Sequence, residues 1–146
     1  MELSKDFEEF FGLLNSYKAR YLVVGGYAFA VHGRPRYTGD IDIFLDSSEV
    51  NARKIIRVLD EFGFGGADIT VRDLTKPDRV IQLGNPPYRI DLLTSISGVT
   101  FSQAWKNRVS GKYGKQIVHF IGKADLIKNK RATGRQKDLL DLDDLE

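Results

Sequence analysis

Apolar side chains recur at helical spacing in several parts of the chain. Residues 4–17 show the pattern most clearly, because Phe7, Phe10, Phe11 and Leu14 would share one face of a helix. Further segments with possible capping residues at their starts, or glycine at their ends, are also predicted to be helical. These segments are residues 27–32, 48–62, 101–107, 123–133 and 135–145.

Short runs of apolar or alternating residues lie between these segments and predict strands. The predicted strands are residues 20–24, 40–45, 67–72, 79–83, 88–93 and 116–121. Helices and strands are interleaved along the chain, and the sequence shows no internal repeat or low-complexity linker. We therefore expect an α/β (α+β) fold, with a mixed β-sheet flanked by helices, that forms a single domain over residues 1–146.

The composition is ordinary for a globular protein, with 42% hydrophobic and 29% charged residues. The absence of cysteine excludes disulfides and thiolate metal sites. The sequence contains no apolar run long enough to cross a membrane and no signal-peptide pattern at its start, so we expect no membrane association and a cytoplasmic location. A net charge of +2 is too small to demand a nucleic-acid partner.

The first candidate for chemistry is a pair of aspartates, Asp40 and Asp42, in a predicted strand. Residues two apart on a strand point to the same face, so these carboxylates would lie together while Ile41 and Ile43 face the core. Two neighbouring carboxylates repel each other, and a divalent cation such as Mg²⁺ removes that cost. The pair is a candidate metal site, although a solvated strand end would have the same pattern.

A third acid, Asp91, alternates with Ile90 and Leu92 in another predicted strand. Three carboxylates on neighbouring strands can hold two metal ions, which can activate an attacking oxygen and stabilise a leaving phosphate. The alternative is that Asp91 forms a salt bridge with Arg89 or another cation.

Phosphate could be bound where the first strand ends, at Gly25 and Gly26. Glycine lets the backbone approach a ligand closely, and the helix that follows offers unpaired N–H groups. In the next loop, Arg36 could hold a triphosphate, and Thr38 is a further candidate for nucleotide binding. A tight strand-to-helix turn is the alternative for the glycine pair. No GK[ST] motif follows it, which disfavours a Walker-type NTPase.

Taken together, these motifs resemble those of nucleotidyltransferases of the DNA polymerase beta superfamily. That pattern is hG[GS], about nine to thirteen residues, Dh[DE]h, and a third acid on a later strand. This chain has Val24-Gly25-Gly26, then thirteen residues, Asp40-Ile41-Asp42-Ile43, and Asp91. Residues 22–46 and the tail, residues 126–145, look especially similar to the AbiEii-type toxin branch and its bacterial relatives.

The resemblance implies the nucleotidyltransferase fold and Mg²⁺-dependent transfer of a nucleoside monophosphate from an NTP to a hydroxyl. Two Mg²⁺ ions, or Mn²⁺ in their place, would be held by Asp40, Asp42 and Asp91, and Asp91 would also help to deprotonate the acceptor. Lys130 would neutralise charge on the phosphates. The remaining residues that the resemblance assigns to nucleotide binding are Gly25, Gly26, Arg135 and Asp138.

The acceptor stays open at this stage. RNA such as tRNA, or a protein, would suit a toxin-like enzyme, which could work with an antitoxin partner or as a homodimer. A small antibiotic molecule would suit a second class with the same core. A non-catalytic module that binds nucleotides or a partner is a third reading.

Overall fold

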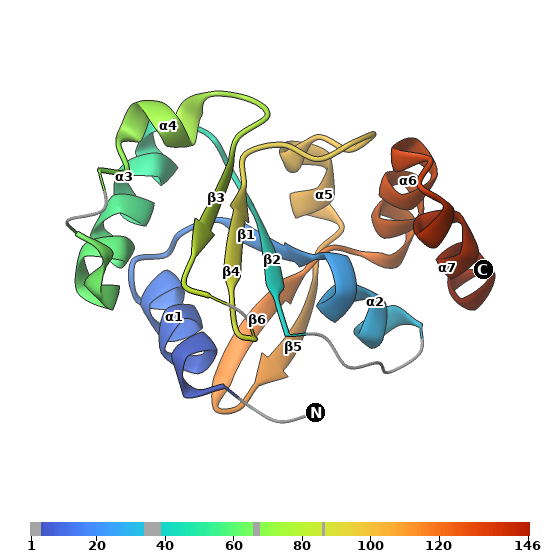
Figure 1. Ribbon diagram of the computed structural model, residues 1–146, viewed down its shortest axis with the longest axis horizontal. Helices are drawn as coiled ribbons and strands as arrows, with labels where there is room; N and C mark the ends of the chain where they lie inside the picture. The colour runs from blue at the N-terminus through green and yellow to red at the C-terminus, as the bar shows by residue number, and fades with distance from the viewer. Residues whose placement is uncertain (1–3, 34–38, 66–67, 86) are drawn as a thin grey trace.

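The computed structural model describes residues 4–33, 39–65, 68–85 and 87–146. Its centre is a six-stranded sheet in the order β3-β4-β2-β1-β6-β5 (Figure 1). The β1–β2, β3–β4 and β5–β6 pairs are antiparallel, whereas β2–β4 and β1–β6 are parallel. The strands are β1 (Tyr21–Val24), β2 (Ile41–Leu45), β3 (Val80–Leu83), β4 (Ile90–Leu93), β5 (Val109–Tyr113) and β6 (Gln116–Phe120). The predicted mixed sheet is confirmed.

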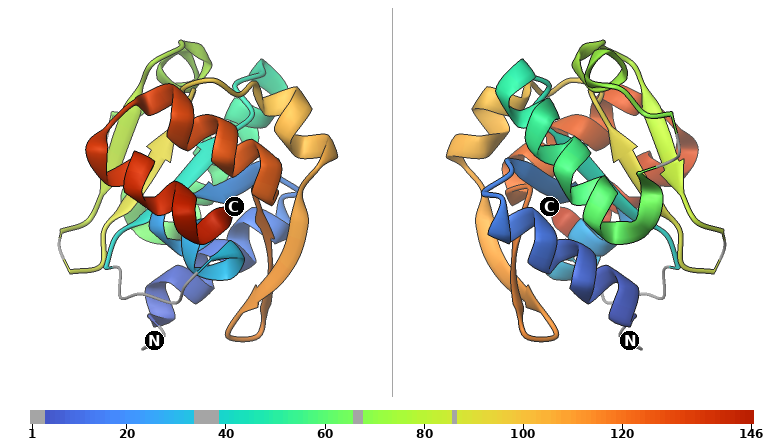
Figure 2. Two further views of the ribbon diagram at one scale, coloured as in Figure 1. Left: turned by 90° about the vertical axis from the view of Figure 1, so that its right-hand side faces the viewer. Right: turned by 90° about the vertical axis from the view of Figure 1, so that its left-hand side faces the viewer.

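Helices cover both faces of this sheet (Figure 2). On one side lie α1 and α3, with α4 packed against α3, and on the other lie α2, α6 and α7. The π-type turn η1 (Asp60–Phe64) continues α3. The helices are α1 (Lys5–Ser16), α2 (Gly25–His32), α3 (Glu49–Leu59), α4 (Val71–Thr75), α5 (Phe101–Lys106), α6 (Lys123–Thr133) and α7 (Gln136–Leu145).

The predicted apolar face of α1 is buried in the core. Phe7, Phe10, Phe11 and Leu14 are all at most 1% exposed. Complete burial of such side chains contributes roughly 1.5–3 kcal/mol each to folding. Ser4 starts the helix, because its hydroxyl accepts a hydrogen bond from the Phe7 N–H at 3.3 Å. The spacing of apolar residues in the sequence therefore fixes how α1 lies on the sheet.

One predicted strand is wrong. Residues 67–72 were expected to be extended, but the described part of this segment leads into α4, which starts at Val71. Thr70 and Asp73 form a reciprocal capping box, in which each side chain accepts a hydrogen bond from the other residue's backbone N–H. This local bonding stabilises a helical turn against the weak strand pattern.

Sequence reading missed β5, which forms a hairpin with β6. Its residues alternate between partly buried and exposed positions and include Ser110, Gly111 and Lys112, which are weak strand formers. The hairpin turns at Gly114, whose φ of +58° is readily adopted by glycine. Pairing with β6 and this turn create the strand. In the part of the chain that the structure describes, no helix is long and apolar enough to cross a membrane.

Candidate active site

The three predicted acids come together where β2 and β4 begin. The parallel register of these strands pairs Asp42 directly with Asp91, and Asp40 immediately precedes β2. Ile41 and Ile43 are buried, at most 1% exposed, as the alternation of the sequence predicted. Neighbouring positions in parallel strands carry their side chains on the same face of the sheet, so the register places the Asp42 and Asp91 carboxylates side by side.

Asp42 carries the unusual electrostatics of this acid edge, the name used below for Asp40, Asp42, Asp91 and Arg89. Burial raises the pKa of Asp42 from 3.8 to about 6, and the negative charges of Asp91 and Asp40 add to the effect. The positive charge of Arg89 opposes the rise without cancelling it. Near neutral pH, Asp42 is therefore ionised at a cost in free energy that a nearby cation would reduce.

Arg89 provides the positive charge at this edge. Its Nε and Nη2 atoms donate to the two carboxylate oxygens of Asp91 at 2.8 and 3.0 Å. Nη2 also lies 3.1 Å from Oδ2 of Asp40. The salt bridge that the sequence left open as the alternative for Asp91 is present. Among the described residues, Arg89 forms no ion pair with Asp42.

The donor set suits Mg²⁺ in chemistry. All three side chains offer carboxylate oxygens, the ligands that Mg²⁺ prefers, and burial together with the neighbouring carboxylates raises the pKa of Asp42. As the described residues stand, no group of three or more His, Cys, Asp or Glu side chains is arranged to hold a metal ion. Arg89 bridges Asp40 and Asp91, so a metal held by all three acids would have to displace its guanidinium.

A cleft of about 460 Å³ opens beside Asp42. Gly25 at the start of α2 and Arg135 before α7 also line it, so three predicted site residues meet there. The other lining residues are Val24, Leu93, Ile96, Ser97, Asn129 and Thr133. A mixture of backbone, hydroxyl, amide and guanidinium groups next to a carboxylate can bind a polar, phosphate-bearing ligand.

The backbone geometry at position 25 requires glycine, whether or not a ligand binds there. Its φ is +65°, and a Cβ built on it would lie 2.3 Å from Oδ2 of Asp42. Only a residue without a side chain allows the Asp42 carboxylate to sit so close to the backbone of β1. Gly26 follows in the first turn of α2. The predicted turn between strand and helix is confirmed, and the phosphate role of these glycines stays a prediction.

Three predicted tail residues, Lys130, Arg135 and Asp138, belong to a second charged group, the α6–α7 ion cluster, which also includes Thr133 and Asp141. The Lys130 ammonium donates to Asp138 at 3.1 Å and to Asp141 at 3.0 Å, and its side chain is 4% exposed. Thr133 and Arg135 each donate to Asp138 at 2.7 Å. Lys130 thus joins α6 to α7 and does not line the cleft, whereas Arg135 does.

The electrostatics of Asp138 are opposite to those of Asp42. Burial by itself would raise the pKa of Asp138. The hydrogen bonds from Thr133, Arg135 and Lys130 outweigh that effect and hold the pKa below its usual range. Lys130, Arg135 and Asp138 therefore form a satisfied network, and the phosphate and nucleotide roles that the resemblance implies for them stay predictions.

A protein-family model matches residues 1–146, the whole chain; its description is "nucleotidyltransferase of unknown function (DUF6036)". The chain belongs to this nucleotidyltransferase family. A candidate nucleotidyltransferase from Thermotoga maritima has a similar crystal structure, with a TM-score of 0.59. The two chains are 18% identical, and the match covers 93% of this chain and 87% of the other. This likeness supports the fold. No curated protein matches the chain.

In this nucleotidyltransferase-family protein, two predicted nucleotide-binding residues, Arg36 and Thr38, lie outside the described residues. Sequence reading missed Asn129 and Thr133, which reach the cleft from α6. Asn129 donates to the Ser97 backbone oxygen at 2.9 Å and so fixes α6 against the turn after β4. Their signal in the sequence is weak, because single Asn and Thr residues in a polar helix are common on solvated faces.

Proposed function

We propose that this protein transfers a nucleoside monophosphate from an NTP to a hydroxyl acceptor, with Mg²⁺ held at the acid edge. The observation that carries the proposal is Asp42, ionised at a cost beside Asp91 and at the wall of a polar cleft. A structural salt bridge alone does not account for a buried carboxylate whose pKa is raised to about 6. Membership of a nucleotidyltransferase family supports the same chemistry.

The reaction is an in-line displacement at the α-phosphorus of the NTP. The acceptor oxygen forms a bond to that phosphorus, and the bond from the phosphorus to the bridging oxygen of pyrophosphate breaks. Asp91 accepts the hydroxyl proton, which requires it to give up one of its bonds to Arg89. Mg²⁺, or Mn²⁺ in its place, when bound by Asp40, Asp42 and Asp91, would supply Lewis-acid stabilisation of the phosphate oxygens.

The cleft supplies the groups that would hold the donor nucleotide. The backbone at Gly25 and Gly26 lies at the start of α2, where N–H groups favour phosphate. Arg135 lines the same cleft and pairs with Asp138, which Lys130 also holds. We assign Arg135 to binding the phosphates. Lys130 and Asp138 would hold Arg135 in position. Direct contact of Lys130 with phosphate would require it to leave Asp138 and Asp141.

The acceptor is an RNA or a protein in this proposal, as in a toxin-like enzyme of the AbiEii type with an antitoxin partner or a second copy of the chain. A small antibiotic acceptor uses the same acid edge and stays an alternative. A non-catalytic nucleotide-binding module is favoured by one observation: Arg89 already neutralises part of the acid edge.

The test is incubation of the purified protein with Mg²⁺ and each α-labelled NTP, with total tRNA and cell extract as acceptors. Asp42→Asn is the matched variant, because it removes the charge and keeps the size of the side chain. We expect label on one acceptor with the wild type and at least about a hundredfold less with Asp42→Asn. Equal labelling by both proteins would contradict the proposed role of the acid edge. Mg²⁺-dependent NTP binding without transfer to any acceptor would favour the non-catalytic module.

A further inference from the structure

A second and larger pocket lies at the opposite end of β1 from the acid edge. Its volume is about 740 Å³, against about 460 Å³ for the cleft beside Asp42. Arg20 lies just before β1 and Gly25 just after it. At about 3.3 Å per residue, the four residues of the strand separate the two sites by roughly 13 Å or more. The pocket therefore does not belong to the cleft already described.

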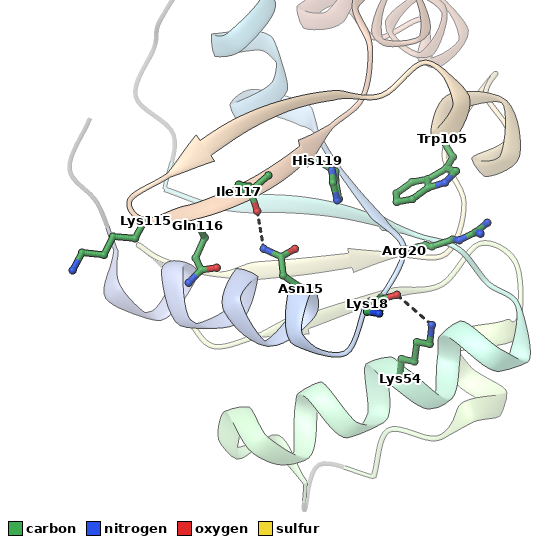
Figure 3. Close-up of a pocket in the computed structure, with 10 residues that line it drawn as sticks. Asn15, Lys18, Arg20, Lys54, Trp105, Lys115, Gln116, Ile117 and His119 are labelled. Carbon is green, nitrogen blue, oxygen red and sulfur yellow. Dashed lines mark hydrogen bonds between the residues drawn. The ribbon is translucent and has the colours of Figure 1, made fainter.

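The walls of this pocket are basic. Lys18, Arg20, Lys54 and Lys115 all line it, and no Asp or Glu is among its lining residues. Within the described part of the chain, none of these four cations forms an ion pair with a carboxylate. Four uncompensated positive charges around one hollow attract an anion. They come from the end of α1, the start of β1, α3 and the β5–β6 turn (Figure 3).

Planar side chains complete the site. Trp105 lines the pocket. The guanidinium of Arg108 lies 3.8 Å from the centre of its ring, and the guanidinium of Arg20 lies 5.5 Å from it. His119 packs against Trp105 with ring centres 5.5 Å apart. Trp105 is half-buried, and the ring of Phe101 stacks on it with ring centres 5.7 Å apart. The part of the indole that lines the pocket, beside guanidinium groups, can contact a nucleic-acid base.

His119 also bears an unsatisfied polar atom. Its Nδ1 is buried and has no hydrogen-bond partner in the described structure. Burial, and secondarily the charge of Arg108, lowers the pKa of His119, so the imidazole is neutral near pH 7. A neutral imidazole can donate or accept a hydrogen bond. His119 thus adds a neutral polar ring to the lining of the pocket.

The spread of the cations favours a strand over a single nucleotide. In Figure 3, Lys115 and Gln116 lie at one end of the pocket, and Arg20, Trp105 and Lys54 lie at the other, with Asn15 and His119 between them. A mononucleotide carries its phosphates at one position, whereas the cations lie at both ends of the pocket. A chain with a phosphate on every nucleotide can contact both ends at once.

We propose that this basic pocket binds single-stranded nucleic acid, with one base on Trp105 and flanking phosphates near Lys18 and Lys115. Its ligand is thus distinct from the NTP of the proposed function. Binding needs no divalent metal and no transfer reaction, so it can be tested separately from the acid edge.

The test uses the fluorescence of Trp105, which is the only tryptophan of the chain. Asp42→Asn protein, which the proposed mechanism makes inactive, is titrated with an oligonucleotide of about twelve residues, as RNA and as DNA. AMP and ATP without Mg²⁺ form the mononucleotide arms. We expect the strand to quench the tryptophan and to bind more tightly than either mononucleotide.

The matched variants are Lys18→Glu/Lys115→Glu and, as a control, Arg72→Glu/Lys123→Glu. All four side chains are exposed, and each double variant makes the same change in net charge. We expect the pocket variant to bind about tenfold more weakly or worse, with a shallower dependence on salt by roughly 0.7 per lost contact. The control variant is expected to bind within about twofold of its parent. Circular dichroism is used to check that each variant is folded.

Three outcomes would overturn the proposal. The first is no quenching of Trp105 by any strand. The second is an equal loss of affinity in both double variants, which would reduce the effect to net charge. The third is binding of mononucleotides as tight as that of the strand, which would make the pocket a nucleotide site. None of these results depends on whether the protein transfers nucleotides.

Discussion

The acid edge and the α6–α7 ion cluster contain the same kinds of side chain and reach opposite electrostatic states. At the α6–α7 cluster, Asp138 accepts from Lys130, Thr133 and Arg135, and its pKa lies below the usual range. At the acid edge, burial and two neighbouring carboxylates raise the pKa of Asp42 to about 6. The first arrangement has enough donors for its buried carboxylates, whereas the second lacks positive charge at Asp42.

This difference separates a structural ion cluster from a candidate catalytic one. Charges that already satisfy each other hold two helices together, and the proposed ligand role of this cluster is limited to Arg135, which lines the cleft. Charges that remain uncompensated cost stability in the free protein, and a bound cation can recover that cost. The comparison therefore supports a mainly structural role for the α6–α7 cluster and the proposed catalytic role for the acid edge, and a specific variant tests each of them.

The largest expected effect is on stability at the α6–α7 cluster. Lys130→Met leaves Asp138 and Asp141 buried without their ammonium, and we expect the free energy of unfolding to fall by about 3–5 kcal/mol. Urea denaturation at pH 7 measures it. Lys128→Met, in the same helix but exposed, is the control and should change stability by less than about 0.5 kcal/mol. A loss below about 1 kcal/mol for Lys130→Met would contradict the structural role.

The second effect has the opposite sign. Asp42→Asn removes a carboxylate whose pKa is raised from 3.8 to about 6. The folded state binds the proton more tightly than the unfolded state, so this group favours folding below pH 3.8 and loses that contribution as pH rises through about 6. Asp42→Asn should therefore gain up to about 3 kcal/mol of stability relative to wild type at pH 8, without divalent metal.

The pH series distinguishes this effect from a general change in packing. The gain from Asp42→Asn should be small near pH 4 and disappear well below pH 3.8, where the carboxyl is protonated in both the folded and the unfolded state. Asp138→Asn should show the reverse dependence on pH. Because the pKa of Asp138 is lowered in the folded state, its carboxylate stabilises the fold above the unfolded-state pKa, and this contribution is lost as pH falls. Denaturation from about pH 2.5 to pH 8 follows both variants, because the Asp138 contribution changes only below its unfolded pKa of 3.8. A destabilised Asp42→Asn protein at pH 8 would count against uncompensated charge at the acid edge.

A smaller effect concerns the glycine that allows Asp42 its position. Gly25→Ala places a Cβ where Oδ2 of Asp42 lies 2.3 Å away, and the backbone there has φ of +65°. The left-handed conformation alone costs about 1–2 kcal/mol. We expect that loss in urea denaturation, together with reduced nucleotidyl transfer. Gly134→Ala is a useful control, since its φ is also +65° but a Cβ there meets no atom within 4 Å. Equal transfer activity in both variants would contradict the role of close approach at Gly25.

The smallest effect concerns Arg89, which pairs with Asp40 and Asp91 and would compete with the proposed metal for them. Arg89→Gln removes the guanidinium charge, and we expect divalent cations to bind a few-fold more tightly. Isothermal titration with Mn²⁺ measures this affinity. Arg79→Gln is the control, because it makes the same change in charge without contact with Asp40, Asp42 or Asp91. Weaker Mn²⁺ binding in Arg89→Gln would show that the guanidinium supports the metal site instead of competing with it.

The sequence predicted the acid edge because its information is local. The alternation around Asp42 and Asp91 places each carboxylate on the polar face of its strand, and the shared register brings the two together. It could not decide between a metal and Arg89 as the partner of Asp91, because side-chain packing makes that choice. In the same way, the capping box of Thr70 and Asp73 outweighed a strand-like pattern that local propensity favoured.

The basic pocket was not predicted, and its construction explains why. Lys18, Lys54, Trp105 and Lys115 come from separate elements, and no short motif contains more than one of them. The β5–β6 hairpin that supplies Lys115 was itself only half predicted. Sites made from several distant elements become visible only when the sheet order is known.

The central claim is that the acid edge holds a divalent cation for nucleotidyl transfer. The most direct measurement is the binding of Mn²⁺, followed by the electron paramagnetic resonance of the free ion, in the presence of a non-hydrolysable NTP analogue. Wild type and Asp42→Asn are compared at pH 8, where Asp42 is ionised. The account predicts that the wild type binds Mn²⁺ at least about tenfold more tightly than the variant. Equal binding by the two proteins, or no binding by the wild type, would contradict it.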